Sequence, residues 1–486
     1  MGNELKVLGK IDLNEYNGHK SPVVDDYEPF RIIAMTVSFW DQEPVGIDIS
    51  MNENGGNYEC RFFSLLIGNN GVGKSTLLRE IVDFFVYAEK GFEDYKTKQV
   101  LILSLQYTMG GHTYNILRSR KEFSYYCDDN YAFKDEMKFP LIIASTMGMF
   151  DKFPYQNNGK RGKEGPYDVS MYKYVGPKAS SNMFSSKTYL MMQMLAMLPA
   201  IKKRRQLTKI ADVLRFIGYE TKLTIKIKLK NTNDPSSEKK RASLSSEAER
   251  YYDNHRNISE DELSIVFDKS TIQYVKGLKL KEINELRQNG LLSWSRCYLY
   301  KDGKEVECNQ LSSGEFNMLS IVMSVVLTAV NKNVLILLDE PEISQHPNWQ
   351  IDIIDNLDAA LDGYNCHFII STHCHFLVSN LPVNRSNVIH MNKIGDQVFQ
   401  KSIEANTYGW SPEEVLLKVF EMTTDRNRYL AEMVGLFIKQ ISEDSISLEN
   451  ANKEIAFLNK VSEGLSDVDP LKKVILAITE EFDENG

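Results

Sequence analysis

The sequence predicts an α/β fold: a mixed sheet that carries a phosphate-binding loop, an inserted and mainly helical subdomain, and a helical C-terminal tail. The buried run at 62–67 leads directly into a glycine-rich loop and then into apolar residues at helical spacing. This is the strand, loop and helix context that a phosphate loop requires. A second buried run, at 335–338, ends in the paired acids Asp339 and Glu340. A third buried run follows at 366–370.

The composition places the chain among ordinary globular proteins. Its 486 residues are enough for about two to three domains or for one large domain with insertions. The net charge of -9 gives no support for nucleic-acid binding by the chain as a whole. No apolar run approaches membrane-spanning length, the first residues lack the apolar core of a signal peptide, and the six cysteines have no metal-ligand spacing. We therefore expect a cytoplasmic protein with reduced thiols and no membrane partner.

Residues 1–125 are expected to form the N-terminal part of the core. Short strands are predicted before the glycine-rich loop, and a helix is predicted after it. A pair of strands joined by Gly110 and Gly111 follows, because this dipeptide is typical of tight hairpin turns. The predicted strands of this part lie at 30–37, 46–49, 62–67 and 99–119.

Residues 126–300 are expected to form the inserted subdomain, which is predicted to be partly helical. A buried strand is predicted at 139–146, and helices are predicted for the methionine-rich segment 187–201 and for 265–292. The segment 231–259 is rich in Ser, Asn, Glu and Lys. This composition predicts a mobile segment, since it offers little apolar surface to bury.

The C-terminal part of the core is expected at 301–405, followed by the helical tail at 406–486. In the tail, Ser411 and Glu414 have the spacing of a capping box, and Pro412 stands at the first helical position.

The glycine-rich loop fits the pattern G-x-x-x-x-G-K-S in full. Glycines let the backbone wrap a phosphate without Cβ clashes, so that amides and a helix N-terminus face the anion. Lys74 would reach the β- and γ-phosphates of ATP, and the Ser75 hydroxyl would bind Mg²⁺. The alternative is a chance glycine turn, which the flanking strand and helix disfavour. The predicted ATP-binding residues of the loop are Gly68, Asn69, Asn70, Gly71, Val72, Gly73, Lys74, Ser75 and Thr76.

Asp339 ends an apolar strand, where a lone carboxylate is costly unless it serves a metal or a donor. We expect Asp339 to hold Mg²⁺ through water, and Glu340 to be the catalytic base that polarises the attacking water. The alternative is a plain strand end before the turn at Pro341. Only 24 residues (339 − 315) separate Asp339 from Glu315 of the next motif, and this short interval favours the catalytic interpretation.

Residues 311–315, Leu-Ser-Ser-Gly-Glu, precede an apolar run that is compatible with a helix. They would place backbone amides at a helix N-terminus, which suits a γ-phosphate, although a plain helix cap has the same pattern. His373 follows the buried run at 366–370 and is expected to contact the γ-phosphate as a neutral donor, although a lone histidine is more often structural. The predicted nucleotide contacts of the short motif are Ser312, Ser313, Gly314 and Glu315.

In this order, the phosphate loop, the signature-like motif, the Asp-Glu strand and the histidine resemble the ABC ATPase superfamily. Residues 342–350, Glu-Ile-Ser-Gln-His-Pro-Asn-Trp-Gln, are similar to the E-x-x-L-H-P-x-W-Q run of the SMC/RecF/OLD-like branch, with Gln345 in place of Leu. Residues 371–377 resemble that branch's S-T-H-S-P-F-L. The resemblance implies that two subunits close head to tail around two ATP molecules. It also implies that a glutamine contacts Mg²⁺, for which Gln156 is the candidate.

Compact ATPases of bacterial antiphage systems are the most similar in style, among them Septu-type, retron-associated and PARIS-type ATPases. The similarity lies in the strand and loop at 142–154 and in the segment 172–176. It implies an ATPase that forms a dimer or a higher oligomer, senses a trigger and controls a separate nuclease or toxin effector. One alternative is a RecF-like repair or recombination ATPase that acts on DNA directly. A transporter subunit is a third, which the long insertion and the His346-Pro347 run disfavour.

Nucleic acid stays open as a partner because three basic runs lie in the inserted region, at 160–163, 202–205 and 239–241. A solvated surface is the favoured interpretation of each run, but runs that converge on one face would bind phosphates. No nuclease signature is visible, so this chain is not expected to cut nucleic acid itself.

Overall fold

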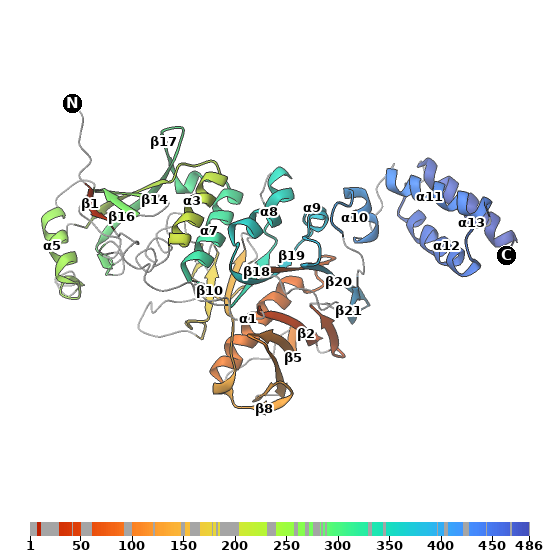
Figure 1. Cartoon of the computed structure of the whole chain (residues 1–486), viewed down its shortest axis with the longest axis horizontal. Coiled ribbons are helices and arrows are strands. Elements are labelled where there is room, and N and C mark those ends of the chain that lie inside the picture. The colour runs from red at the N-terminus through yellow and green to blue at the C-terminus, as the bar shows by residue number, and fades with distance from the viewer. Residues whose placement is uncertain are drawn as a thin grey trace.

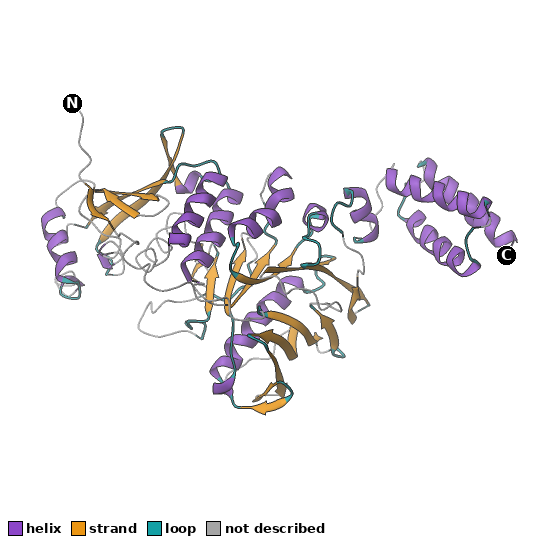
Figure 2. Ribbon diagram, in the orientation of Figure 1, coloured by secondary structure: helices purple, strands orange, loops and turns teal. Residues whose placement is uncertain are grey.

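The computed structural model describes much of the chain, in segments that form three sheets and a C-terminal group of helices (Figures 1 and 2). Within this part, no helix is both long and apolar enough to cross a membrane. The described residues are 7–10, 29–40, 42–49, 61–91, 100–119, 122–146, 151–155, 166–176, 178–180, 183–184, 204–230, 240–256, 261–267, 272–275, 282, 285–286, 289–328, 333–343, 347–395, 397–402, 407–420, 427–443, 445–466 and 469–485.

A seven-stranded sheet, in the order β10-β9-β18-β19-β4-β20-β21, lies at the centre. Its neighbouring strands are parallel except for β20 and β21, so the sheet is mixed, as predicted. The inner strands β4, β9, β18 and β19 are buried along nearly their whole length, which explains their almost continuous apolar sequences. The strands are β4 (Arg61–Gly68), β9 (Leu141–Thr146), β10 (Tyr172–Val175), β18 (Asn333–Asp339), β19 (Asn365–Ser371), β20 (Ser386–Ile394) and β21 (Gln397–Ser402).

Alternate residues of the central strands pack into two separate cores. In β4, Phe63, Leu65 and Ile67 belong to the core on one face, and Leu66 belongs to the core on the other. Helices α7, α8 and α9 cover the first face and α1 covers the second (Figure 1). Because the strands are parallel, their carboxyl ends meet at one edge, where ligands bind in such sheets. The helices are α1 (Lys74–Lys90), α7 (Ser313–Thr328), α8 (Pro347–Ala360) and α9 (His375–Ser379).

A second sheet, antiparallel and in the order β3-β2-β5-β6-β7-β8, packs on the far side of α1 (Figure 1). It contains the strands predicted around 30–49 and 99–119. The predicted hairpin turn is present, because Gly110 and Gly111 join β5 to β6 with φ angles of 62° and 79°. The strands are β2 (Arg31–Phe39), β3 (Val45–Asp48), β5 (Val100–Met109), β6 (His112–Ser119), β7 (Glu122–Cys127) and β8 (Asn130–Ala132).

The inserted part differs from the prediction, because its described residues form a sheet rather than a mainly helical subdomain. Six antiparallel strands follow the order β1-β15-β14-β13-β16-β17, and α3 packs between this sheet and α7. One of these strands, Lys222–Leu229, has the alternating apolar and charged residues of a half-buried strand, a signal that the sequence analysis did not use. The elements are β1 (Val7–Lys10), β13 (Lys222–Leu229), β14 (Asp261–Phe267), β15 (Ile272–Val275), β16 (Leu292–Lys301), β17 (Lys304–Glu307), α3 (Arg204–Phe216) and α5 (Ser246–His255).

Three further predictions for residues 126–300 can be compared with the structure. The helix predicted over 265–292 is wrong at its start, where β14 and β15 pair with each other in register. The predicted mobile segment 231–259 contains α5, because Ser245 caps this helix by accepting a hydrogen bond from the Ala248 N–H. The strands β9 and β10 fall within 126–300 but belong to the central sheet. The helix predicted at 187–201 lies outside the described residues.

The helical tail is confirmed. Helix α10 starts as predicted, with the Ser411 side chain accepting a hydrogen bond from the Glu414 N–H and Pro412 in the first turn. The next three helices share a hydrophobic core of their own, which includes Leu430, Phe437 and Leu458 (Figure 1). The helices are α10 (Pro412–Lys418), α11 (Arg428–Ser442), α12 (Leu448–Glu463) and α13 (Pro470–Asn485). Two short strands, β11 (Lys178–Ser180) and β12 (Met183–Phe184), and two single turns, Lys134–Glu136 and Cys308–Gln310, complete the described elements.

Candidate nucleotide-binding site

The glycine-rich loop joins β4 to α1 at the carboxyl edge of the central sheet. Gly68, Gly71 and Gly73 all have positive φ, between 83° and 145°, which side chains rarely adopt. A Cβ on Gly68 would lie 2.2 Å from the carbonyl oxygen of Met391, and a Cβ on Gly73 would lie 3.2 Å from the ring of Phe39. A Cβ on Gly71 would meet nothing within 4 Å. The loop therefore needs glycine for its path, and it leaves open space at its middle for a phosphate.

Lys74, the first residue of α1, is only 5% exposed although it carries an ammonium group. Its Nζ donates to the carbonyl oxygen of Gly68 at 2.7 Å and lies 2.8 Å from Nε2 of His373. Burial lowers the pKa of Lys74 to about 8, although the nearby Glu340, Asp339 and Glu342 carboxylates act in the opposite direction. The ammonium is thus held inside the loop, where it would meet an anionic ligand.

Asp339 faces the Ser75 hydroxyl at the same edge. Oγ of Ser75 donates to Oδ1 of Asp339 at 2.9 Å, and the Ser371 hydroxyl donates to the same oxygen. Asp339 is only 7% exposed. A hydroxyl and a carboxylate that converge in this way are the oxygen donors that Mg²⁺ prefers, so the residues present fit the predicted ion. Gln156, the third predicted ligand, lies outside the described residues.

Glu340 directly follows β18 and has a φ of 49°, which is unusual for a residue with a side chain. Its N–H donates to the Ser371 carbonyl oxygen at 3.0 Å, so the turn is fixed to the end of β19. Burial, together with the neighbouring Asp339, raises the pKa of Glu340, and Lys74 partly offsets this rise. A carboxylate with a raised pKa, next to a candidate metal ligand, suits general-base chemistry.

His373 lies between these groups. Its Nε2 is 2.8 Å from the Lys74 ammonium and 3.5 Å from Oε1 of Glu340. Burial, and to a smaller extent the Lys74 charge, lowers the pKa of His373 below its ordinary value. The imidazole is therefore neutral at pH 7, as the sequence analysis expected. The chain brings together residues that follow β4, β18 and β19, far apart in sequence.

The signature-like motif starts α7 at the carboxyl edge as well. Nδ2 of Asn317 donates to the Pro341 carbonyl oxygen at 3.4 Å, and the Ser145 hydroxyl donates to Oδ1 of Asn317 at 3.5 Å. These bonds place the start of α7 beside the ends of β18 and β9. In the sheet order β9 is three strands from β4, roughly 14 Å at the usual strand spacing. Within the described residues, no hydrogen bond joins residues 312–315 to the phosphate loop of the same chain.

Two residues beside the loop were not predicted as site residues. Nζ of Lys152 donates to Oγ1 of Thr76 at 2.7 Å. The Trp40 ring reaches within 3.6 Å of where a Cβ on Gly73 would lie, and Nζ of Lys393 stands 4.9 Å from the centre of that ring. Lys152 lies in the strand and loop at 142–154, to which the sequence analysis assigned no chemical role. No pattern in a single sequence points to Trp40, since it approaches the loop from another sheet.

The basic runs give little support for a nucleic-acid surface. The run 160–163 lies outside the described residues, and so does the first half of 202–205. In the third run, the Arg241 guanidinium pairs with Glu249 at 3.0 Å and with Asp253 at 2.5 Å. Because these acids neutralise Arg241, its guanidinium stabilises the inserted part rather than binding an external phosphate.

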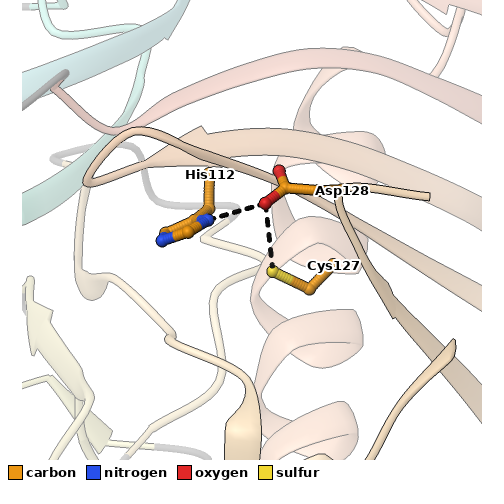
Figure 3. Close-up of side chains that lie close together, drawn as sticks. All are labelled: His112, Cys127 and Asp128. Carbon is orange, nitrogen blue, oxygen red and sulfur yellow. Dashed lines mark hydrogen bonds and ion pairs between the residues drawn. The ribbon is translucent and has the colours of Figure 1, made fainter. Parts of the chain in front are cut away.

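A second group of possible metal-ligating side chains lies on the outer sheet (Figure 3). The fold brings Cys127 beside His112 and Asp128, which the spacing of the cysteines had not indicated. Asp128 accepts hydrogen bonds from Nδ1 of His112 at 2.7 Å and from the Thr113 N–H at 2.9 Å. The hydrogen bond from His112 is the main cause that lowers the pKa of Asp128. These bonds join the turn between β7 and β8 to the start of β6, and we assign the group this structural role.

Comparisons with known proteins relate part of the chain to ATPases. Residues 178–378 match the family described as AAA ATPase domain. Septu protein PtuA of Bacillus thuringiensis is 25% identical over 143 residues, which are 29% of this chain and 34% of that protein. The retron Vc95 probable ATPase of Vibrio cholerae serotype O1 biovar El Tor is 25% identical over 126 residues, 24% of each chain. The matched part thus spans about a third and about a quarter of the lengths of these relatives.

Among solved structures, heads of SMC proteins are similar to this chain. The SMC head bound to the C-winged helix domain of ScpA has a TM-score of 0.37 and 11% identity, over 77% of this chain and 98% of that structure. The SMC head domain from Thermotoga maritima has a TM-score of 0.37 and 10% identity, over 77% of this chain and 100% of that structure.

The match to the AAA ATPase domain contains the signature-like motif, the acidic strand and His373, while the phosphate loop precedes it in sequence. In the structure the acidic strand and His373 meet the phosphate loop at one edge of the central sheet. The chain therefore combines a mixed α/β fold with a match to the AAA ATPase domain over residues 178–378.

Proposed function

We propose that the chain hydrolyses Mg²⁺-ATP in a head-to-tail dimer, and that ATP occupancy controls a separate nuclease or toxin effector in bacterial antiphage defence. The convergence of Lys74, Ser75, Asp339, Glu340 and His373 at one edge of the sheet carries the proposal. These five side chains follow three different strands, so a chance glycine turn does not explain their meeting.

The phosphate loop binds the nucleotide. Open amides around Gly71 and the N-terminus of α1 face the phosphates, and Lys74 exchanges its Gly68 carbonyl partner for β- and γ-phosphate oxygens. Ser75 and Asp339 would hold Mg²⁺, which would supply positive charge to the phosphate oxygens. Gln156 is proposed as a further ligand on the resemblance alone.

Glu340 and His373 divide the remaining tasks. Glu340 orients the attacking water and accepts its proton, since its raised pKa improves it as a base. His373 donates a hydrogen bond to the γ-phosphate as a neutral imidazole, because burial and Lys74 disfavour its charged form. Removing one such donor or base commonly costs about 10² or more in rate.

The nucleotide has two further contacts beside the loop. The indole of Trp40 offers a flat apolar surface near Gly73, on which a base stacks. Lys152 stands at Thr76, where its ammonium adds a second cation for the phosphates. Both residues extend the site from its phosphates toward the rest of the nucleotide.

The second half of each ATP site comes from another copy of the chain. The motif from Ser312 to Glu315 starts a helix at the same edge, and within the described residues no hydrogen bond joins it to the loop of its own chain. Ser312 is exposed, so its helix N-terminus is accessible to a γ-phosphate that a partner holds. A head-to-tail pair gives each motif such a phosphate, and higher oligomers can be built from such pairs.

Control of an effector rests on the names of the relatives and on our assignment of the acid cluster to ATP. The names of the two curated relatives associate them with a Septu system and a retron. Hydrolysis of a phosphodiester requires a metal or an acid–base cluster, and we commit Ser75, Asp339 and Glu340 to ATP. The killing activity is therefore assigned to a partner protein.

The proposal is tested with the purified chain. We expect phosphate release from ATP that requires Mg²⁺, a dimer of Glu340→Gln that appears in light scattering only with ATP, and no cleavage of plasmid or RNA. Expression beside a neighbouring effector gene should protect cells from phage, and Lys74→Ala should abolish the protection. Absence of ATP hydrolysis, or nucleic-acid cleavage that depends on a residue outside the ATP site, would contradict the proposal.

A further inference from the structure

We propose that Glu342 is a positioning residue for hydrolysis: its buried carboxylate fixes the backbone of His373, so that the imidazole is held between Lys74 and Glu340. The inference rests on the proposed ATPase function. It concerns a residue that contacts the backbone of His373 but not its imidazole.

Glu342 lies in the turn that follows β18 and is only 8% exposed. Its Oε1 accepts two hydrogen bonds, from the Thr372 hydroxyl at 2.6 Å and from the His373 N–H at 3.1 Å. Both donors belong to the turn that follows β19, directly where the imidazole leaves the backbone. One carboxylate oxygen therefore joins the turns after two neighbouring strands.

A second set of bonds closes the connection. Oγ1 of Thr372 accepts a hydrogen bond from the Cys374 N–H at 2.9 Å, and the Cys374 thiol lies 3.5 Å from Oε1 of Gln350. Nε2 of Gln350 in turn lies 3.3 Å from the Glu342 carbonyl oxygen. Thus α8, the Glu342 turn and the His373 turn form one hydrogen-bonded ring, with Glu342 as the member that bonds to both of the others.

The consequence appears at the imidazole. His373 lies 2.8 Å from the Lys74 nitrogen and 3.5 Å from the Glu340 carboxylate only as long as its backbone keeps this position. A displacement of about 1 Å at a reacting group typically costs about 10²-fold in rate. The Glu342 bonds therefore set the geometry of hydrolysis without taking part in it.

Burying the Glu342 carboxylate costs free energy, and this cost indicates that the carboxylate has a functional rather than a purely structural role. Oε2 of Glu342 is buried and has no hydrogen-bond partner among the described residues. Burial accordingly raises the pKa of Glu342, because the charged form loses its hydration. A threonine or asparagine would close the turn without burying a charge, whereas a carboxylate makes the stronger, charge-assisted bonds to the His373 backbone.

The test is a double-mutant cycle on ATP hydrolysis, with Glu342→Ala, His373→Ala and the double variant. We expect Glu342→Ala to lower kcat by about 10- to 100-fold while KM for ATP changes less than about threefold. In the His373→Ala background the same change should lower kcat by no more than about twofold, since the residue acts through the imidazole. Glu342→Gln keeps an acceptor oxygen and should recover most of the loss.

The pH profile separates positioning from general weakening. Because burial and Lys74 hold the pKa of His373 low, a displaced imidazole titrates nearer its ordinary value, and the acid limb of kcat in Glu342→Ala should move to higher pH. Glu443→Ala, a change of the exposed glutamate that directly follows α11, is the matched control and should leave the profile in place.

Three results would overturn the inference: wild-type kcat in Glu342→Ala, additive losses in the double variant, or an unmoved acid limb. If Glu342→Ala fails to fold, Thr372→Val removes one of the two bonds and must itself show a loss that vanishes in the His373→Ala background. A wild-type chain without ATP hydrolysis would instead refute the proposed function, so the two failures are distinguishable.

Discussion

The phosphate loop and the signature-like motif are two helix N-termini at the same edge of one sheet. Side chains from other segments surround the first, whereas the second is capped by its own residues. At the start of α1 the loop glycines leave space, and three other segments supply side chains to it. At the start of α7 the helix caps itself: the Glu315 N–H donates to the Ser312 hydroxyl at 3.2 Å, and the Ser312 N–H donates to Glu315 at 2.7 Å.

This difference teaches which half of the site the chain completes alone. The loop half is preorganised, because its lysine, hydroxyl and acids already contact one another in a single chain. The signature half has an exposed serine and no acid, lysine or histidine of the loop among its hydrogen-bond partners in the described residues. We therefore expect changes in the loop half to act within a chain, and changes in the signature half to act on the partner's ATP.

The largest effect is expected at Glu340. Glu340→Gln removes the carboxylate that accepts the water proton but keeps Ser75 and Asp339 for Mg²⁺, so hydrolysis should fall by about 10²–10⁴ while ATP binding persists. Single-turnover phosphate release and equilibrium ATP binding measure the two quantities separately. Turnover at the wild-type rate would remove Glu340 from the mechanism.

Ser312→Arg should lower hydrolysis by about 10²-fold, since the larger side chain blocks the N-terminus of α7 and with it the γ-phosphate of the partner. ATP binding by the phosphate loop of the same chain should stay within about threefold of the wild type, because the motif does not contact that loop. Titration with a fluorescent ATP analogue gives the affinity. A large loss of affinity would mean that the two halves are not independent.

ATP affinity should fall as the pH rises through about 8. The protonated form of Lys74 binds the phosphates, and burial gives the free chain a Lys74 pKa of about 8, so above this pH a proton must be taken up on binding. The loss should approach about tenfold per pH unit. Lys74→Arg, which stays charged over this range, should flatten the curve in calorimetric titrations even if its affinity is lower. An equally steep curve in Lys74→Arg would assign the titration to another group.

The smallest effect is expected for Lys152, which lies beside the phosphate loop. Lys152→Ala should weaken ATP binding by only about two- to fivefold, because an exposed ammonium contributes little in water. Lys138→Ala, at another exposed lysine, serves as the control. An effect of Lys152→Ala that equals that of the control would restrict the site to the loop itself.

The parts of the site that could be predicted from sequence are those in which neighbours along the chain carry the chemistry. The loop from Gly68 to Ser75 and the pair Asp339 and Glu340 are contiguous, and buried strands of near-continuous apolar sequence lead into them. Other roles depend on contacts between segments that are distant in sequence, as for Glu342, Lys152 and Trp40. The spacing of residues along the chain does not predict such contacts.

The fold divides in the same way. The central sheet was predictable because parallel strands that are buried on both faces have unmistakable sequences. The inserted sheet was not predicted, because several of its strands are short and depend on pairing across strands, as Lys226 pairs with Glu305 at 2.8 Å; the alternating pattern of Lys222–Leu229 was available but was not used. Short strands of this kind, such as 261–267 and 272–275, resemble helical segments until their pairing is known.

The central claim, that two chains share each ATP site, is tested most directly by mixing two inactive variants. Lys74→Ala lacks a working loop and Ser312→Arg lacks a working signature, but a heterodimer of the two has one interface in which both halves are intact. Random pairing of equal amounts should restore about a quarter of the wild-type ATPase activity, since half of the dimers are mixed and each has one working site of two. No recovery, in a sample where affinity tags demonstrate the mixed dimer, would contradict the shared site.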